Sequence, residues 1–202
     1  MRKRVAWNLV RWLIPSEKRF YFEGNPKISG QLWYRERIQV HQVVRQFKPR
    51  VCFEIGTWRG GGSTYYIAHA LWQNGNGSLH TIEVDRSLYL EAIKNYRTYL
   101  PHFAPHVEFH LGNYQEVYDR ILRATNTVDF VILDGPEDAQ ETLNQYNFFL
   151  PYFKEGAVLI SHDWFSEKSR LLKNVIEEGD SWEIKSILSS IESVGLMTAI
   201  RR

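Results

Sequence analysis

From Arg50 onward, short apolar runs alternate with longer amphipathic segments, and this alternation constrains the fold more than any other feature of the sequence. Strand-helix units repeated in this way build a parallel sheet with helices on both faces. Strands are expected at 51–55, 78–84, 107–111, 128–133 and 157–161, and helices at 63–72, 87–100, 115–124, 137–150 and 169–178. The fold class is therefore α/β, with a Rossmann-like, doubly wound and mainly parallel sheet.

The last two predicted strands, 182–188 and 194–200, have only a short polar loop between them. So short a connection requires an antiparallel pair. A C-terminal antiparallel pair distinguishes this sheet from a nicotinamide-binding Rossmann domain. In open sheets of this kind, ligands bind beyond the carboxyl ends of the strands.

Residues 1–49 are expected to form a helical extension in front of a domain over residues 50–202. Basic side chains crowd residues 2–19 among apolar ones such as Trp7 and Trp12, and Pro15 ends this predicted amphipathic helix. One interpretation is a helix that docks on a membrane surface or a partner. The other is a helix packed on the domain, or a lid over its active site. The segment is too short, and too interrupted by Arg11, to span a membrane.

Charge and cysteine content limit the possible partners and the cellular compartment. The formal net charge of +2 gives no overall attraction to nucleic acid. The single cysteine, Cys52, lies in an apolar run, which fits a buried thiol in a reducing cytoplasm. The sequence leaves open whether the protein forms a homo-oligomer.

The first strand ends in Glu54, Ile55 and Gly56, and the turn continues through Gly60-Gly61-Gly62 to Ser63. Glycines permit a tight turn and a close approach of backbone to a ligand. Either Ser63 or Thr64 is expected to cap the next helix, whose first amides favour an anion such as a carboxylate. Glu54 is expected to meet a cation such as an α-ammonium.

The next two strand ends also carry polar groups. An acid after the second strand can accept both hydroxyls of a ribose, and Glu83 is the first candidate, with Asp85 the second. After the third strand come Asn113, Tyr114 and Gln115. They are expected either to bind an adenine edge and face or to serve as an ordinary turn and helix cap.

Asp134 ends the wholly apolar fourth strand, with Glu137 nearby, and His162 and Asp163 end the fifth. Three interpretations remain open. The group could bind a divalent cation such as Mg²⁺ or Ca²⁺. It could be an acid-base group in which His162 takes a proton. It could also be a set of hydrogen bonds that hold loops together.

These four strand ends together resemble class I S-adenosylmethionine (SAM)-dependent methyltransferases, from about Arg50 to the end of the sequence. The similarity is greatest to the small-molecule O-methyltransferases that include the catechol and macrolide sugar enzymes. The resemblance implies roles for individual residues. Those expected to contact SAM are Glu54, Gly56, Gly60 and Ser63 at the methionine part, Glu83 at the ribose, and Tyr114 and Gln115 at the adenine, with Asp134 beside them. Asp134, His162 and Asp163 fall on the positions that carry the metal in metal-dependent members.

Three positions depart from the family pattern. The turn has one glycine more than the usual Gly-Gly-Ser-Thr. Glu137 stands where relatives often have a His or Lys base, and His162 where they use a carboxylate. The catalytic hypothesis is that His162, oriented by Asp134 or Asp163, activates a hydroxyl of a small molecule such as a sugar, polyol or phenol.

Two other functions compete with this one. A non-catalytic or regulatory SAM-binding protein would use the same cofactor site. An NAD-dependent oxidoreductase would want Gly-x-Gly-x-x-Gly, whereas three residues separate Gly56 from Gly60. A nucleic-acid methyltransferase is disfavoured, because there is no broad basic face and no Asn/Asp-Pro-Pro-aromatic tetrapeptide after the fourth strand. Aromatic residues expected near the acceptor are Trp33, Tyr34, Trp58, Trp164 and Phe165.

Overall fold

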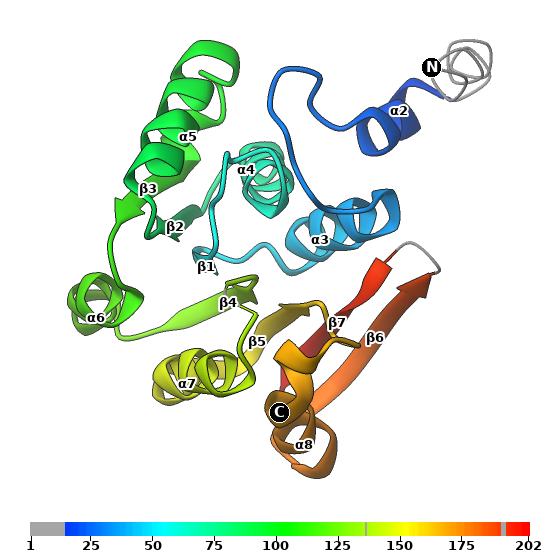
Figure 1. Cartoon of the computed structure of the whole chain (residues 1–202), viewed down its shortest axis with the longest axis vertical. Coiled ribbons are helices and arrows are strands. Elements are labelled where there is room, and N and C mark those ends of the chain that lie inside the picture. The colour runs from blue at the N-terminus through cyan, green and yellow to red at the C-terminus, as the bar shows by residue number, and fades with distance from the viewer. Residues whose placement is uncertain (1–14, 136, 191–192) are drawn as a thin grey trace.

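The computed structural model describes residues 15–135, 137–190 and 193–202, which form one seven-stranded sheet with helices on both faces (Figure 1). The strand order is β3-β2-β1-β4-β5-β7-β6. The strands are β1 (Val51–Ile55), β2 (Ser78–Glu83), β3 (Val107–Leu111), β4 (Val128–Leu133), β5 (Phe153–His162), β6 (Trp182–Ser190) and β7 (Ser193–Arg201). The helices are α2 (Ser16–Glu23), α3 (Tyr34–Phe47), α4 (Ser63–Asn74), α5 (Arg86–Tyr99), α6 (Tyr114–Thr125), α7 (Ala139–Phe149) and α8 (Arg170–Glu178).

Strands β3, β2, β1, β4 and β5 are parallel, whereas β7 runs antiparallel to both β5 and β6. The predicted fold class and terminal pair are thereby confirmed. Strand β5 begins at Phe153, four residues before the predicted start at residue 157. The early part, which includes Lys154 and Glu155, is exposed and polar, so it lacked the apolar signal of a buried strand.

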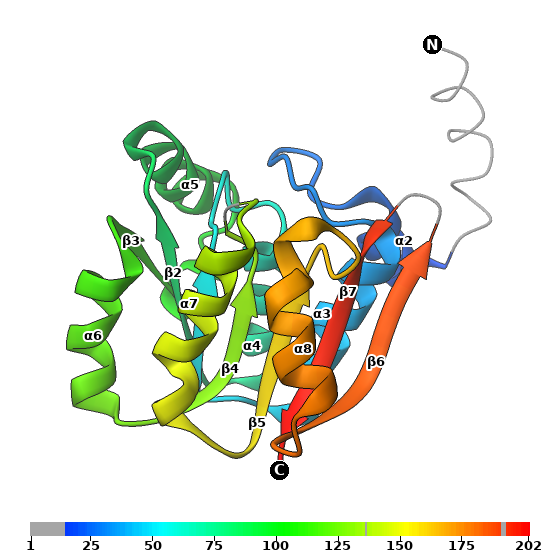
Figure 2. The same cartoon turned by 60° about the horizontal axis from the view of Figure 1, so that its bottom comes forward.

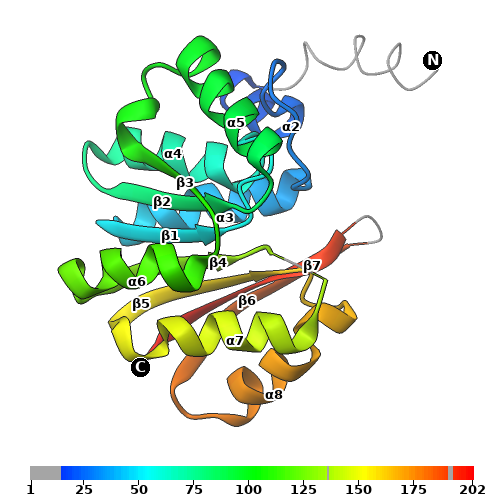
Figure 3. The ribbon, with the colours of Figure 1, turned by 60° about the vertical axis from the view of Figure 1, so that its left-hand side comes forward.

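Alternate residues of each strand contribute to two separate cores. In β1, Cys52 packs toward α3, α4 and α5, while its neighbour Phe53 packs toward α6, α7 and α8. This is the period of two expected for a strand that is buried on both faces. Figure 3 shows the sheet between these two helical layers. The strand ends are thus held by packing from both sides.

Helix α3 belongs to the first of these cores, since Val40 and Val44 are fully buried beside α4 residues such as Tyr66. In α2, the ring of Phe20 meets that of Tyr66 at a centroid distance of 5.1 Å. Figure 2 shows α3 behind the sheet, with α2 close to it. The described part of residues 1–49 therefore packs directly on the sheet domain, and the division at residue 49 stays a prediction.

The predicted basic helix over residues 2–19 falls mainly on residues 1–14, which lie outside the described residues. Its docking or lid role stays a prediction. Among the described helices, none combines the length and apolar character needed to cross a membrane.

Candidate active site

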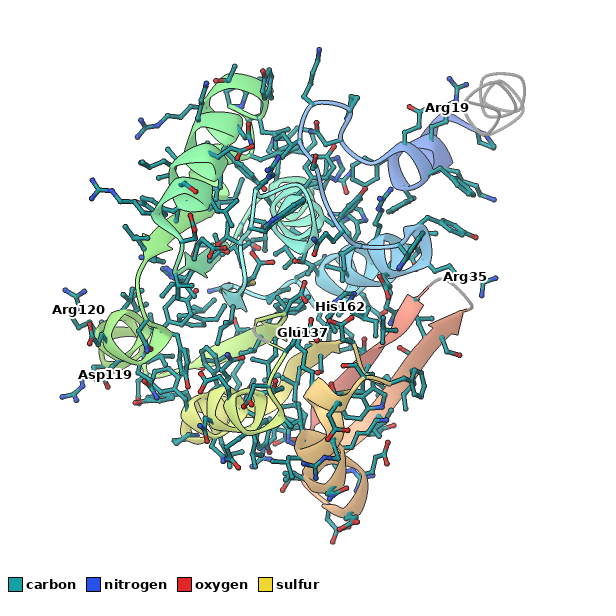
Figure 4. The ribbon with its side chains drawn as sticks, viewed as in Figure 1. Arg19, Arg35, Asp119, Arg120, Glu137 and His162 are labelled. Atoms are coloured by element: carbon teal, nitrogen blue, oxygen red, sulfur yellow. The ribbon has the colours of Figure 1, made fainter. Side chains whose placement is uncertain are left out.

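A cavity of about 640 Å³ lies at the carboxyl ends of the parallel strands. This is a usual size for a small-molecule site. Predicted site residues that line it are Gly56, Glu83, Tyr114, Asp134, His162 and Asp163. Figure 4 shows labelled His162 and Glu137 near the middle of the view, and Glu137 also lines the cavity. The other predicted cofactor residues, Glu54, Gly60, Ser63 and Gln115, lie outside the lining.

Gly56 brings the turn after β1 against the end of β4. Its φ is +102°, and a Cβ there would lie 2.2 Å from the carbonyl oxygen of Asp134. No L side chain fits this position. The backbone of the turn can therefore border the cavity directly.

Gly61, the middle glycine of Gly60-Gly61-Gly62, has a packing role. A Cβ on Gly61 would lie 2.2 Å from the carbonyl oxygen of Ser29, and one on Gly30 would lie 2.1 Å from the carbonyl oxygen of Gly61. The loop before α3 therefore lies backbone to backbone on the turn. Gly60, with φ at +78°, packs against the ring of Tyr96 instead of facing the cavity.

Glu54 is fully buried behind this turn. Its Oε2 accepts hydrogen bonds from the hydroxyls of Thr64 and Thr81, each at 2.6 Å. Burial raises the pKa of Glu54 to about 7, although hydroxyls including that of Ser63 oppose the rise. The expectation that Ser63 or Thr64 caps α4 is wrong, because the N-cap is Gly62 and no side chain caps the helix.

Glu83 is held toward the cavity by backbone amides. Its Oε2 accepts from the N–H of Trp58 at 2.8 Å, and its Oε1 accepts from those of Val84 and Asp85 at 2.9 and 3.0 Å. Three donors fix the carboxylate before any ligand binds. Asp85, the second candidate for the ribose, instead caps α5 by accepting from the amide of Ser87 at 2.7 Å.

Asn113 forms the helix cap that was one of the two roles left open for the end of the third strand, and adenine binding there stays a prediction. Its side chain caps α6 by accepting from the amide of Gln115 at 2.8 Å, and it also lines the cavity. Tyr114 lines the cavity beside it.

His162 lies among three carboxylates. Its Nδ1 is 2.9 Å from Asp134 Oδ1 and 3.3 Å from Asp163 Oδ1, and its Nε2 is 3.3 Å from Glu36 Oε2. Burial disfavours the charged ring, but these hydrogen bonds outweigh it and raise the pKa of His162 to about 12. At neutral pH the ring already carries the proton that the base hypothesis would have it accept. Both ring nitrogens therefore act as donors.

Lys168 is a second buried cation in this cluster. It belongs to the 3₁₀-helix Glu167–Ser169 and is 2% exposed. Its Nζ lies 3.4 Å from Asp134 Oδ1 and 3.3 Å from Asp163 Oδ2. One atom each of Asp134, His162 and Asp163 come within 4.8 Å of one another, a spacing that could hold a metal ion. However, the ammonium of Lys168 already lies between the two carboxylates, so the donor set does not fit a divalent cation.

The cavity lining is acidic. Its carboxylates are those of Glu83, Asp134, Glu137, Glu141 and Asp163. Among the described lining residues there is no lysine or arginine. A phosphate-bearing ligand would be repelled by this lining, whereas a ligand with a sulfonium and an ammonium would be attracted.

Sequence reasoning missed three buried polar residues of this region, namely Glu36, Lys168 and Gln145. Gln145 is 2% exposed and lines the cavity, and its Oε1 has no hydrogen-bond partner among the described residues. The signal for Gln145 was its place on the buried face of α7, beside Thr142 and Tyr146.

Of the aromatic residues expected near the acceptor, Trp33 and Trp58 line the cavity, whereas Trp164 is buried in the core.

A second histidine cluster lies apart from the cavity, on strands β2 and β3. The ligand atoms of His80, Glu108 and His110 come within 4.8 Å of one another. Burial lowers the pKa of His80, and lowers that of His110 to about 4, so both rings are neutral at pH 7. Nδ1 of His80 and Nε2 of His110 share a hydrogen bond at 3.2 Å, which accounts for their proximity.

Residues 53–164 match a family described as a methyltransferase domain. Comparison with curated proteins gave no match. The structure is similar to the O-methyltransferase TomG from Streptomyces achromogenes in complex with SAM, with a TM-score of 0.72, 18% identity and coverage of 98% of this chain and 96% of that one. It is also similar to the O-methyltransferase from Bacillus cereus in complex with SAH, with a TM-score of 0.73, 17% identity and coverage of 98% of this chain and 97% of that one. A methyltransferase from Geobacter sulfurreducens gives a TM-score of 0.65, 16% identity and coverage of 98% of this chain and 96% of that one.

Proposed function

Because this chain belongs to the methyltransferase-domain family, we propose that it is a SAM-dependent O-methyltransferase acting on a hydroxyl of a small molecule. The acidic lining of the cavity carries the proposal. SAM brings a sulfonium and an ammonium to its site, and the lining carboxylates suit both charges. The SAM- and SAH-bound O-methyltransferases of similar fold add support.

Cofactor binding would rest on three of the described strand ends. Glu83, fixed by three amides, would accept the ribose hydroxyls, and Tyr114 with Asn113 would border the adenine. Gly56 would let the turn approach the methionine part. Glu54, Gly60 and Ser63 would act from behind by fixing the turn, and Gln115 through the first turn of α6.

Bound SAM would supply an electrophilic methyl group: an acceptor oxygen would attack the methyl carbon in line as the bond to sulfur breaks, with S-adenosylhomocysteine as the leaving group. We assign the acceptor hydroxyl to the end of the cavity at Asp134, which is the more exposed of the two aspartates there. Asp134 would take the proton of the acceptor hydroxyl while the hydroxyl oxygen bonds to the methyl carbon. His162 holds its own proton and stabilises negative charge on that oxygen, and Asp163 orients the ring.

Calorimetric titration with SAM, followed by transfer of labelled methyl to sugars, polyols and phenols, tests the proposal. Glu83→Ala should weaken SAM binding about 30-fold, through loss of a hydrogen-bonding charged group. Asp85→Ala is the matched control, because it removes a helix cap next to the site and should leave SAM affinity within about threefold. Asp134→Asn should bind SAM and lose transfer.

Failure of the folded protein to bind SAM would refute the proposal, and binding of NAD in its place would support the oxidoreductase. SAM binding without transfer to any acceptor would favour the regulatory alternative.

We further propose, from the single buried Cys52, that the protein acts in the cytoplasm.

A further inference from the structure

Lys168 occupies an unusual position for a lysine. Lysines are almost never fully buried unless paired, yet this one is 2% exposed. The chain turns back after β5 to bring it there: Asp163 has a φ of +57°, and its carbonyl oxygen accepts from the hydroxyls of Ser166 at 2.9 Å and Ser169 at 3.2 Å. The backbone is thus shaped to place an ammonium beneath the strand ends.

The two carboxylates that Lys168 contacts end neighbouring strands. Nζ lies at nearly equal distances from Asp134 Oδ1 and Asp163 Oδ2, 3.4 and 3.3 Å. A divalent cation shared by the same two oxygens would need to approach them within about 2.0–2.6 Å and would meet the ammonium there. Each nitrogen of His162 also faces a carboxylate oxygen, so a cation bound at this ring would have to displace one of those contacts.

The charges of the cluster nearly balance without a metal. Three carboxylates, of Glu36, Asp134 and Asp163, face two cations, His162 and Lys168. Addition of a divalent cation would leave an excess of positive charge beside the site of a cationic cofactor. Removal of the lysine would leave two carboxylates facing each other with one partner fewer.

We propose that Lys168 is a built-in replacement for a divalent cation at the ends of β4 and β5, and that methyl transfer by this protein is independent of metal. The proposal rests on the proposed function. Lys168 does not line the cavity, so it is a positioning residue that acts through Asp134 and Asp163. It fixes both carboxylates and, with His162, supplies the positive field that would favour an oxyanion of the acceptor.

The test uses the full chain after treatment with EDTA. Wild-type transfer should change by less than about twofold on addition of Mg²⁺, and Mn²⁺ titration followed by electron paramagnetic resonance should give a Kd weaker than about 1 mM. Lys168→Met should lower kcat about tenfold or more while the KM for SAM changes less than about threefold. It should also bind Mn²⁺ at least about tenfold more tightly than wild type, and Asp163→Asn in the same protein should abolish that gain.

Two further variants separate charge from packing. Lys168→Arg keeps a cation and should recover part of the lost kcat without binding Mn²⁺. Lys154→Met is the matched control, since Lys154 pairs with the buried Asp129 at the opposite end of the sheet, and it should acquire no Mn²⁺ site.

Restoration of an EDTA-inactivated wild type by a divalent cation would overturn the proposal. So would wild-type Mn²⁺ binding that Asp163→Asn abolishes, or a folded Lys168→Met protein that keeps full kcat or gains no Mn²⁺ affinity. If Lys168→Met fails to fold, the proposal is tested by the metal dependence and Mn²⁺ affinity of the wild type, together with the kcat and Mn²⁺ binding of Lys168→Arg. If no acceptor is methylated, the Mn²⁺ affinities of the wild type and of Lys168→Met still test the role of Lys168. Failure of the proposed function can therefore be distinguished from failure of this proposal.

Discussion

Oε2 of Glu36 lies 3.3 Å from Nε2 of His162 and so joins helix α3 to the end of strand β5. Glu36 has no exposed surface. Its carboxylate also accepts from the amide of Trp33 at 2.8 Å and from the hydroxyl of Ser193 on β7. One buried carboxylate therefore ties three distant parts of the chain to the candidate active site.

Glu36→Ala should lower the free energy of unfolding by about 3 kcal/mol, because it leaves the buried imidazolium of His162 without one of its partners. Glu36→Gln keeps an acceptor for Trp33 and should lose less. Urea unfolding at pH 7 measures both changes, with the exposed Glu177→Ala on α8 as the control. A loss below about 1 kcal/mol for Glu36→Ala would show that the contact contributes little.

The stabilisation that His162 provides should depend on pH with a definite sign. Its folded-state pKa, about 12, lies above the usual 6.5, so the contribution is complete below pH 6.5 and is lost as the pH rises toward 12. The groups that face the ring are Glu36, Asp134 and Asp163, with Lys168 behind the two aspartates. The pKa values of Glu36 and Asp163 are lowered, because hydrogen bonds outweigh their burial, so their contributions fall only in acid.

Comparison of the wild type with His162→Gln isolates the contribution of this ring. The difference in unfolding free energy should shrink by about 1 kcal/mol for each pH unit between pH 7 and pH 9. Denaturant unfolding at three pH values gives the slope. A difference that stays constant or grows over this range would mean that the ring is not held protonated.

Gly61→Ala should lower the free energy of unfolding by about 2–3 kcal/mol, because its Cβ would lie 2.2 Å from the backbone of Ser29. Gly62→Ala is a sharp control one residue away, since the nearest atom to its Cβ is 3.7 Å distant. Because Gly62 is the N-cap of α4, the variant should still cost about 1 kcal/mol, less than Gly61→Ala. Thermal unfolding of both variants checks the contrast, and equal losses would contradict the packing role of Gly61.

Gln145→Leu should leave the free energy of unfolding unchanged or raise it by up to about 1 kcal/mol, because it removes a buried oxygen that has no partner among the described residues. Affinity for SAM or for the acceptor should fall about tenfold if that oxygen receives a hydrogen bond from a ligand. Calorimetry and thermal unfolding give the two results, with the exposed Gln140→Leu on the same helix as control. A less stable protein with unchanged affinities would contradict a ligand-facing role.

Much of the sheet could be predicted because its strands are short apolar runs between charged residues or glycines. The bounds of β1, β3 and β4 agree with the prediction. The rule that parallel strands end at one edge also predicted that Glu83, Asp134 and His162 would share a cavity.

The rest of the site depends on tertiary packing that no local pattern records. Glu36 lies between Arg35 and Arg37, a run that is typical of a solvated helix face. Lys168 lies in a polar segment typical of a surface loop. The burial of Glu54 follows from the alternation along β1, which places it on the Cys52 side of the sheet under the start of α4, and its contact with SAM stays a prediction.

The position of β7 between β5 and β6 makes the attachment of β6 depend on a strand that follows it in the chain. In the described sheet, β6 pairs only with β7, so residues 182–190 can join the sheet only together with residues 193–201. Ser193, a partner of Glu36, arrives with that same last strand. Docking of residues 193–201 therefore both closes the edge of β5 and brings the Ser193 hydroxyl to the buried carboxylate of Glu36, which couples completion of the sheet to completion of the candidate site.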